Sequence, residues 1–204
     1  MATREVGVLP PDRRRLLIET AAREFARAGY ERASLNRIIR ACGMSKSSFY
    51  HYVASKDALF DMVVTEVGGS LVRALRVPDP EELTGPDFWG RIAQLLEQLM
   101  VASQREEMFD DFGRLFYLAD APTGGSLDVA RAHIDAWLGQ TLAAGRASGA
   151  VREDLPASLQ GHITLAVLRA MDDWSLRHMV DLDPRQRQQL ATAQFDAVRR
   201  LLAR

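Results

Sequence analysis

A glycine turn between two short helical runs constrains the fold of this chain more than any other feature of its sequence. The runs cover residues 34–42 and 45–52, and Gly43 lies between them. A serine begins each run, and a serine hydroxyl caps a helix by accepting from backbone N–H groups of its first turn. Two short helices joined by a tight glycine turn form a helix-turn-helix. The sequence therefore predicts this motif within residues 34–52.

Helical signals extend through almost all of the remaining chain. Leu17, Ala21 and Phe25 recur at helical spacing in residues 12–28, where Asp12 is a candidate cap. A fourth helix is predicted from Ser55 onward and ends before Pro78. Beyond a linker at residues 77–87, we expect helices over residues 88–105, 107–118, 126–148, 157–180 and 184–203. We find no repeats and no convincing strands, so the predicted fold class is all-α.

The start of the last helix carries the clearest local signal. Asp183 precedes Pro184, and Gln186 follows at the position that completes a capping box. Proline at the first helical position is favoured because its missing N–H group has no partner there in any case. We expect this helix to begin sharply at residue 184.

Charge and cysteine content narrow the class of protein. Residues 1–60 carry 11 Lys or Arg against 6 Asp or Glu, whereas the rest of the chain carries 15 against 21. A basic end on a slightly acidic body suits a polyanionic partner. Cys42 is the single cysteine, so no intramolecular disulfide can form. We see no signal peptide and no apolar run of the roughly 18 residues that a membrane span needs, and we expect a cytoplasmic protein.

The second helix of the predicted motif is too polar to be a core element. Only Phe49 and Val53, four residues apart, are expected to point inward. The side chains expected to point outward are Lys46, Ser47, Ser48, Tyr50, His51 and Tyr52. Short hydroxyls let a helix lie close to base edges, whereas lysine and tyrosine bind phosphates. This pattern predicts a recognition helix in the major groove of DNA, and the alternative is a solvated polar turn.

Residues 17–59 resemble the DNA-binding domain of TetR/AcrR-type transcriptional regulators. The match to the family pattern has no gaps over these residues. The shared features are the apolar-Ala-Phe-Gly-Tyr first helix, the Ser-Leu start of the second helix, the Gly-Met-Ser turn, Tyr50 and the Ser-Lys-Asp start of the fourth helix. The sequence departs from the family pattern at Ser47, where glycine is common, at Val53, where phenylalanine is common, and at Ala54, where proline is common. The first departure concerns base preference and the other two concern packing.

The resemblance implies a three-helix helix-turn-helix DNA-binding domain at residues 1–60 and a helical effector-binding and dimerisation domain at residues 61–204. The residues expected at the DNA are Ser34, Asn36, Arg37, Lys46, Ser47, Ser48, Tyr50, His51, Tyr52 and Lys56. Among them, Lys46, Ser47 and Ser48 are expected to contact bases, and Tyr50, Tyr52 and Lys56 to hold phosphates. The resemblance also implies a homodimer formed through residues 157–180 and 184–203, bound to an inverted repeat in double-stranded DNA.

An effector cavity in the C-terminal domain is a further implication of the resemblance. We expect its lining to include Phe112, Phe116, Trp137 and Trp174, with His133, His162, Arg169 and Asp173 as polar anchors. The alternative for each residue is an ordinary core or surface position. The many aromatic residues and methionines favour a lipophilic or aromatic effector over a sugar or a phosphate. The histidines lack the close spacing of metal ligands, and we expect neither a metal nor a cofactor.

The predicted function is that of a sequence-specific transcriptional regulator, most often a repressor in this family, which a small effector releases from its operator. The alternative is a helical small-molecule-binding or interaction protein without a defined operator. We expect no enzyme activity, because the sequence shows no nucleophile–base pair and no metal cluster. Asp172 and Asp173 form a carboxylate pair, but no partner base is visible for them.

Overall fold

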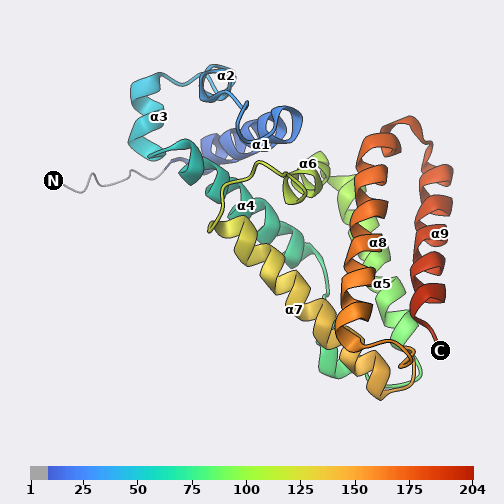
Figure 1. The fold of residues 1–204 in the computed structure, drawn as a ribbon. Helices are drawn as coiled ribbons and strands as arrows, with labels where there is room; N and C mark the ends of the chain where they lie inside the picture. The colour runs from blue at the N-terminus through green and yellow to red at the C-terminus, as the bar shows by residue number, and fades with distance from the viewer. Residues whose placement is uncertain (1–8) are drawn as a thin grey trace. The chain divides into compact units, whose positions relative to one another are not determined.

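The computed structural model describes residues 9–204, apart from the side chains of Glu107 and Val180 (Figure 1). This part of the chain is helical, and the all-α prediction is confirmed. The α-helices are α1 (Pro11–Ala28), α2 (Leu35–Ala41), α3 (Lys46–Tyr52), α4 (Lys56–Ala74), α5 (Phe88–Arg105), α6 (Glu107–Phe116), α7 (Ser126–Ala147), α8 (Ala157–His178) and α9 (Pro184–Leu202). Two short 3-10 helices are η1 (Pro80–Leu83) and η2 (Met179–Asp181). None of the described helices combines the length and the apolar character that crossing a membrane requires.

The chain forms two compact units. Of the described residues, the first unit comprises 9–73 and 106–130, and the second unit comprises 74–105 and 131–204. The boundaries of these units differ from the boundary of the predicted domains, which comprise residues 1–60 and 61–204. The assignment of DNA binding to the first predicted domain and of effector binding and dimerisation to the second stays a prediction.

Helix α1 supplies the centre of the first unit. Leu17, Ala21 and Phe25 are fully buried, as their spacing predicts, and the ring of Phe25 meets that of Phe60 edge-on at 5.1 Å. Helix α1 packs against both α2 and α6. The helix begins at Pro11 rather than at Asp12, so the expectation that Asp12 caps it is wrong. Proline at the first helical position is preorganised for the helix, and this signal prevails at the start of α1.

Hydrogen bonds to two carboxylates connect the segment between α6 and α7, and the first residue of α7, to other parts of the first unit. Asp120 accepts hydrogen bonds from the backbone N–H groups of Tyr30, at 3.2 Å, and of Glu31, at 2.9 Å. Asp61 of α4 accepts from the N–H group of Ser126 at 2.8 Å. The turn that follows α1, the start of α4 and the start of α7 are therefore tied together by charge-assisted hydrogen bonds.

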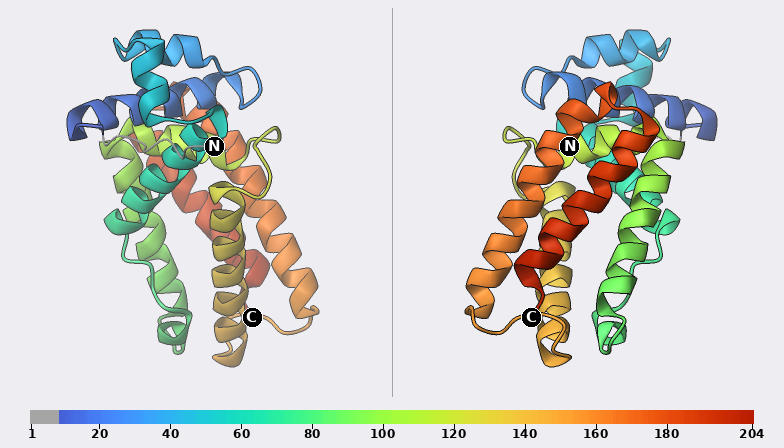
Figure 2. Two further views of the ribbon diagram at one scale, coloured as in Figure 1. Left: turned by 90° about the vertical axis from the view of Figure 1, so that its left-hand side faces the viewer. Right: turned by 90° about the vertical axis from the view of Figure 1, so that its right-hand side faces the viewer.

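The second unit has its own apolar core, formed by Leu83, Phe88, Leu142, Val151 and Leu202. Leu83 belongs to η1, so the stretch predicted as a linker also contributes a core residue. Helices α8 and α9 lie side by side and run in opposite directions (Figures 1 and 2). The capping box at the start of α9 is confirmed, because Asp183 and Gln186 exchange two hydrogen bonds of 2.9 Å.

Candidate nucleic-acid interface

The turn between α2 and α3 is built around Gly43. This glycine has a φ of +62°, in the left-handed region that other residues adopt only at a cost. On either side, serines cap the two helices as predicted. The hydroxyl of Ser34 accepts from the N–H group of Arg37 at 3.3 Å, and that of Ser45 accepts from the N–H group of Ser48 at 3.0 Å. Local chemistry thus sets the start of each helix, and Gly43 supplies the backbone conformation of the turn between them.

Helix α3 is anchored by a single buried ring and the residue that follows the helix. Phe49 and Val53 are almost completely inaccessible to solvent, as predicted. Lys46, Ser47 and His51 are exposed, whereas Ser48 is half-buried. The helix therefore packs through a narrow face and leaves its polar side open.

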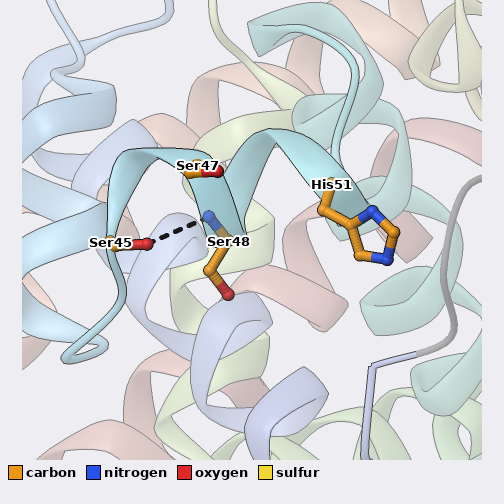
Figure 3. A pocket seen from close by; sticks show the side chains of 4 residues that line it. All are labelled: Ser45, Ser47, Ser48 and His51. Atoms are coloured by element: carbon orange, nitrogen blue, oxygen red, sulfur yellow. Dashed lines mark hydrogen bonds between the residues drawn. The ribbon is translucent and has the colours of Figure 1, made fainter.

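The open side of α3 forms a shallow, polar depression of about 390 Å³. Figure 3 shows its lining residues Ser45, Ser47, Ser48 and His51, with the capping hydrogen bond of Ser45 drawn as a dashed line. Hydroxyl and imidazole groups at such a surface can both donate and accept hydrogen bonds. The depression offers the donor and acceptor variety that base edges in a major groove require.

The start of α2 is held by a buried carboxylate that sequence reasoning did not single out. Glu24 of α1 is only 6% exposed, and its Oε1 accepts from the backbone N–H group of Ser34 at 3.0 Å. Nη1 of Arg37 donates to Oε1 at 2.7 Å and to Oε2 at 3.0 Å. Arg27 donates to Oε2 at 3.0 Å. The only sequence signal for this cluster is an acidic residue that directly precedes Phe25 on the buried side of α1.

The start of α4 meets the turn that follows α1. Nζ of Lys56 donates to the carbonyl oxygen of Glu31 at 2.9 Å and lies 4.9 Å from the centre of the Tyr30 ring. The hydroxyl of Tyr30 donates to Asp57. Lys56 thus has a structural role in addition to its predicted contact with phosphate, which stays a prediction.

The remaining DNA-site predictions concern Asn36, Tyr50 and Tyr52. Asn36 and Tyr50 are exposed, and Tyr52 is half-buried with its ring 4.9 Å from that of His51. All three lie on or beside the exposed sides of α2 and α3. Their contacts with DNA stay predictions, as do those of the other residues assigned to this site.

The residues predicted to line an effector cavity lie in varied surroundings on α6, α7 and α8. Phe112 is buried and Phe116 is half-buried, whereas His133, His162 and Arg169 are exposed. The Nε1–H group of Trp137 donates to the carbonyl oxygen of Pro78 at 3.0 Å, so this ring belongs to the core of the second unit.

The last two of these residues interact with the final turn of α8. Trp174 is 46% exposed and stacks on His178 at 4.5 Å. Asp173 forms an ion pair with Arg177 at 2.6 Å. The eight residues belong to both compact units, and their joint role in effector binding stays a prediction. Among the described side chains, no group of three or more His, Cys, Asp or Glu residues is arranged to hold a metal ion.

Comparison with known proteins supports a helix-turn-helix regulator. Residues 17–63 match the family model described as bacterial regulatory proteins, tetR family. The HTH-type transcriptional repressor Rv1474c of Mycobacterium tuberculosis is 41% identical over 54 residues, which cover 26% of this chain and 29% of that protein. The matched stretch thus spans less than a third of this relative. The resemblance of the N-terminal helix-turn-helix segment to TetR/AcrR-type regulators is confirmed over residues 17–63.

Solved structures extend the similarity of fold over the whole chain. A TetR family transcriptional regulator from Chloroflexus aurantiacus has a TM-score of 0.70 and 23% identity, covering 100% of this chain and 99% of that chain. AibR, in complex with isovaleryl coenzyme A and operator DNA, has a TM-score of 0.68 and 18% identity, covering 90% and 96%. These likenesses show the fold.

Proposed function

We propose that this chain is a sequence-specific, DNA-binding transcriptional repressor. The observation that carries the proposal is α3, which is anchored through Phe49 and Val53 and leaves a polar side open. A helix embedded on a narrow face and polar on the other has the form that enters a major groove. The match of residues 17–63 to the tetR family model supports the same function.

Contacts with bases and with phosphates have separate roles in this proposal. Lys46, Ser47 and Ser48 contact base edges, since they occupy the first turn of α3 beside its open surface. Tyr50, Tyr52 and Lys56 hold phosphates and fix the register of the helix on the duplex. Phosphate contacts supply affinity without sequence information, whereas base contacts discriminate among sequences.

The repressor acts as a homodimer in which α8 and α9 of two copies pack together. Leu159 and Trp174 of α8 are large apolar residues that are 44% and 46% exposed in the single chain. An apolar face of this kind is buried in a symmetric pair, which in turn requires an inverted repeat in the DNA. The two recognition helices then contact half-sites about one helical turn, ~34 Å, apart.

A small lipophilic or aromatic effector in the C-terminal domain relieves repression. AibR, which has the same fold, binds both isovaleryl coenzyme A and operator DNA. An effector lowers DNA affinity to the extent that it binds the DNA-incompatible state of the dimer more tightly. Helix α4 is the element that follows the helix-turn-helix directly. A shift in the position of α4 therefore carries the effect of the bound effector to the helix-turn-helix.

Selection from random-sequence duplex DNA tests the proposed function. The wild-type protein should enrich an inverted repeat, and a scrambled duplex of the same composition should bind much more weakly at the same salt concentration. Recovery of a pool without a shared motif would contradict sequence-specific binding.

A further inference from the structure

The buried carboxylate of Glu24 replaces a missing part of the helix cap of α2. In a capping box, the third helical residue is Glu or Gln and accepts from the N–H group of the capping serine. In α2 the capping residue is Ser34, and the third helical residue is Arg37, which cannot accept. Glu24 of α1 takes over this function, since its Oε1 accepts from the N–H group of Ser34 at 3.0 Å.

The arginine at the box position is bound to the same carboxylate. Nη1 of Arg37 donates to both oxygens of Glu24, and Arg27 donates to Oε2. A buried carboxylate is costly unless it is paired, so Glu24 strongly favours the side-chain conformation of Arg37 that reaches it. The cluster holds one negative and two positive charges and is therefore positive toward its surroundings.

Arg37 binds Glu24 through only one nitrogen of its guanidinium group, Nη1. Its Nη1 group reaches Glu24, while the side chain remains 58% exposed. A guanidinium presents its five N–H donors in a rigid planar fork, so Nε and Nη2 can bind a second anion while Nη1 stays paired. Arg37 lies in the first turn of α2, beside the exposed Asn36.

We infer that Glu24 is a positioning residue for DNA binding, which holds Arg37 so that its free edge meets a backbone phosphate. The inference rests on the proposed function and adds a residue that does not itself touch DNA. Because Arg37 is already ordered by Glu24, little further conformational freedom is lost when it binds the phosphate. The same carboxylate fixes the start of α2 and so links α1 to the helix-turn-helix.

Replacement of Glu24 by glutamine separates this role from general electrostatics. In Glu24→Gln the amide oxygen still accepts from Ser34, but the charge that holds Arg37 is lost. Removal of a negative charge near DNA strengthens binding if the charge acts only at long range. Our inference requires the opposite sign, with binding to the selected duplex about tenfold weaker, the size of one charge-assisted hydrogen bond.

Glu19→Gln provides a matched control. Glu19 also lies on α1 and pairs with an arginine, Arg15, at 2.7 Å, but that pair lies on the surface. The same chemical change at this position should leave DNA affinity unchanged or raise it slightly. Equal weakening in both variants would overturn the inference.

Two further measurements distinguish positioning from a purely structural role. Arg37→Ala should reduce the slope of log affinity against log salt concentration by about one, the loss of one phosphate contact. In an Arg37→Ala background, Glu24→Gln should cause no further weakening. An unchanged slope would show that Arg37 makes no phosphate contact, and fully additive losses would show that Glu24 acts without Arg37. Either result overturns the inference.

Thermal unfolding shows whether the Glu24→Gln variant remains folded. If it does not, Arg37→Lys is the variant that tests the inference. Lysine keeps the positive charge but lacks the planar guanidinium group, whose N–H donors can bind two anions at once. The inference predicts about tenfold weaker binding for Arg37→Lys, and unchanged affinity overturns it. Wild-type protein that selects no motif contradicts the proposed function, whereas wild-type selection without any effect of Glu24→Gln contradicts this inference alone.

Discussion

Gly29 and Gly43 illustrate how single residues set the geometry of the first unit. Both have a positive φ, +78° and +62° respectively. A Cβ atom at Gly43 would meet no described atom within 4 Å, whereas one at Gly29 would lie 2.9 Å from Oδ2 of Asp120. Gly43 is needed for its backbone conformation alone, and Gly29 also makes room for a carboxylate that binds the following N–H groups.

The two glycines are therefore expected to differ in their tolerance of alanine. Gly43→Ala should lower the free energy of unfolding by about 1–2 kcal/mol, the cost of a left-handed conformation. Gly29→Ala should lower it further, because it also displaces Asp120 from Tyr30 and Glu31. Urea unfolding of both variants measures the difference. Equal losses would show that the Asp120 contacts contribute nothing to stability.

Cys42 is expected to behave as a weakly reactive thiol. Burial raises the pKa of the Cys42 thiol above its ordinary value, so the thiol stays protonated at neutral pH. The thiolate is the reactive form, and alkylation at pH 7 should therefore be slower in the folded protein than in urea. The alkylation rate should rise with pH in both the folded and the unfolded protein. In the folded protein this rise should occur at higher pH, because the pKa of the thiol is raised there. Equal alkylation rates in folded and unfolded protein would contradict this account.

At the scale of helices, α4 and α6 meet at a glycine. Gly68 belongs to α4, and a Cβ atom there would lie 3.0 Å from Cζ of the buried Phe112 on α6. Two adjacent glycines, Gly68 and Gly69, lower the helix propensity at this point, but α4 is an unbroken helix from Lys56 to Ala74. Gly68 thus serves the close approach of Phe112.

Neighbouring alanine substitutions in α4 test this interpretation. Gly69→Ala should raise the free energy of unfolding by about 1 kcal/mol, because alanine favours a helix and its Cβ meets only the flexible end of Arg73, 3.3 Å away. Gly68→Ala should be less stable than Gly69→Ala, since Phe112 must shift. Chemical denaturation gives both values. If Gly68→Ala stabilises as much as Gly69→Ala, the Phe112 contact is not tight.

Several helix boundaries were predictable because their signals are local, although α1 begins at Pro11 rather than at the predicted Asp12. The predicted ends of α5, residues 88 and 105, agree with the structure, and the capping box of α9 is present. Serine caps and the Gly43 turn likewise involve residues at most a few positions apart. The burial of Phe49 and Val53 beside exposed neighbours also follows from helical spacing alone.

The contacts that sequence reasoning missed are long-range. Asp120 and Tyr30 are 90 positions apart, and no periodicity connects them. Glu24 was not predicted to be buried, because an acidic residue on a helix is ordinarily a surface residue. Leu83 lies in a proline-rich stretch without helical spacing, yet it is a core residue. Such pairings depend on how distant segments pack, which local patterns do not encode.

At the scale of the whole molecule, the proposed dimer depends on the exposed apolar residues of α8. Trp174→Asp would place a charge in a desolvated interface and should yield a folded monomer. Val72→Asp is the matched control, because Val72 is 62% exposed on α4, outside the proposed interface. Sedimentation equilibrium at micromolar concentration measures the mass. A monomeric wild type, or a Val72→Asp variant that dissociates equally, would contradict the proposed interface.

The central claim is that the first turn of α3 discriminates among base sequences, and binding-site selection with variants tests it most directly. Wild type, Lys46→Ala, Ser47→Ala and Ser48→Ala should each be used to select duplexes from the same random pool at one salt concentration. Each variant should lose preference at particular positions of the inverted repeat, by roughly 1–3 kcal/mol for a good contact, and keep the other positions. Recovery of the same motif with the same preferences by all four proteins would contradict the claim.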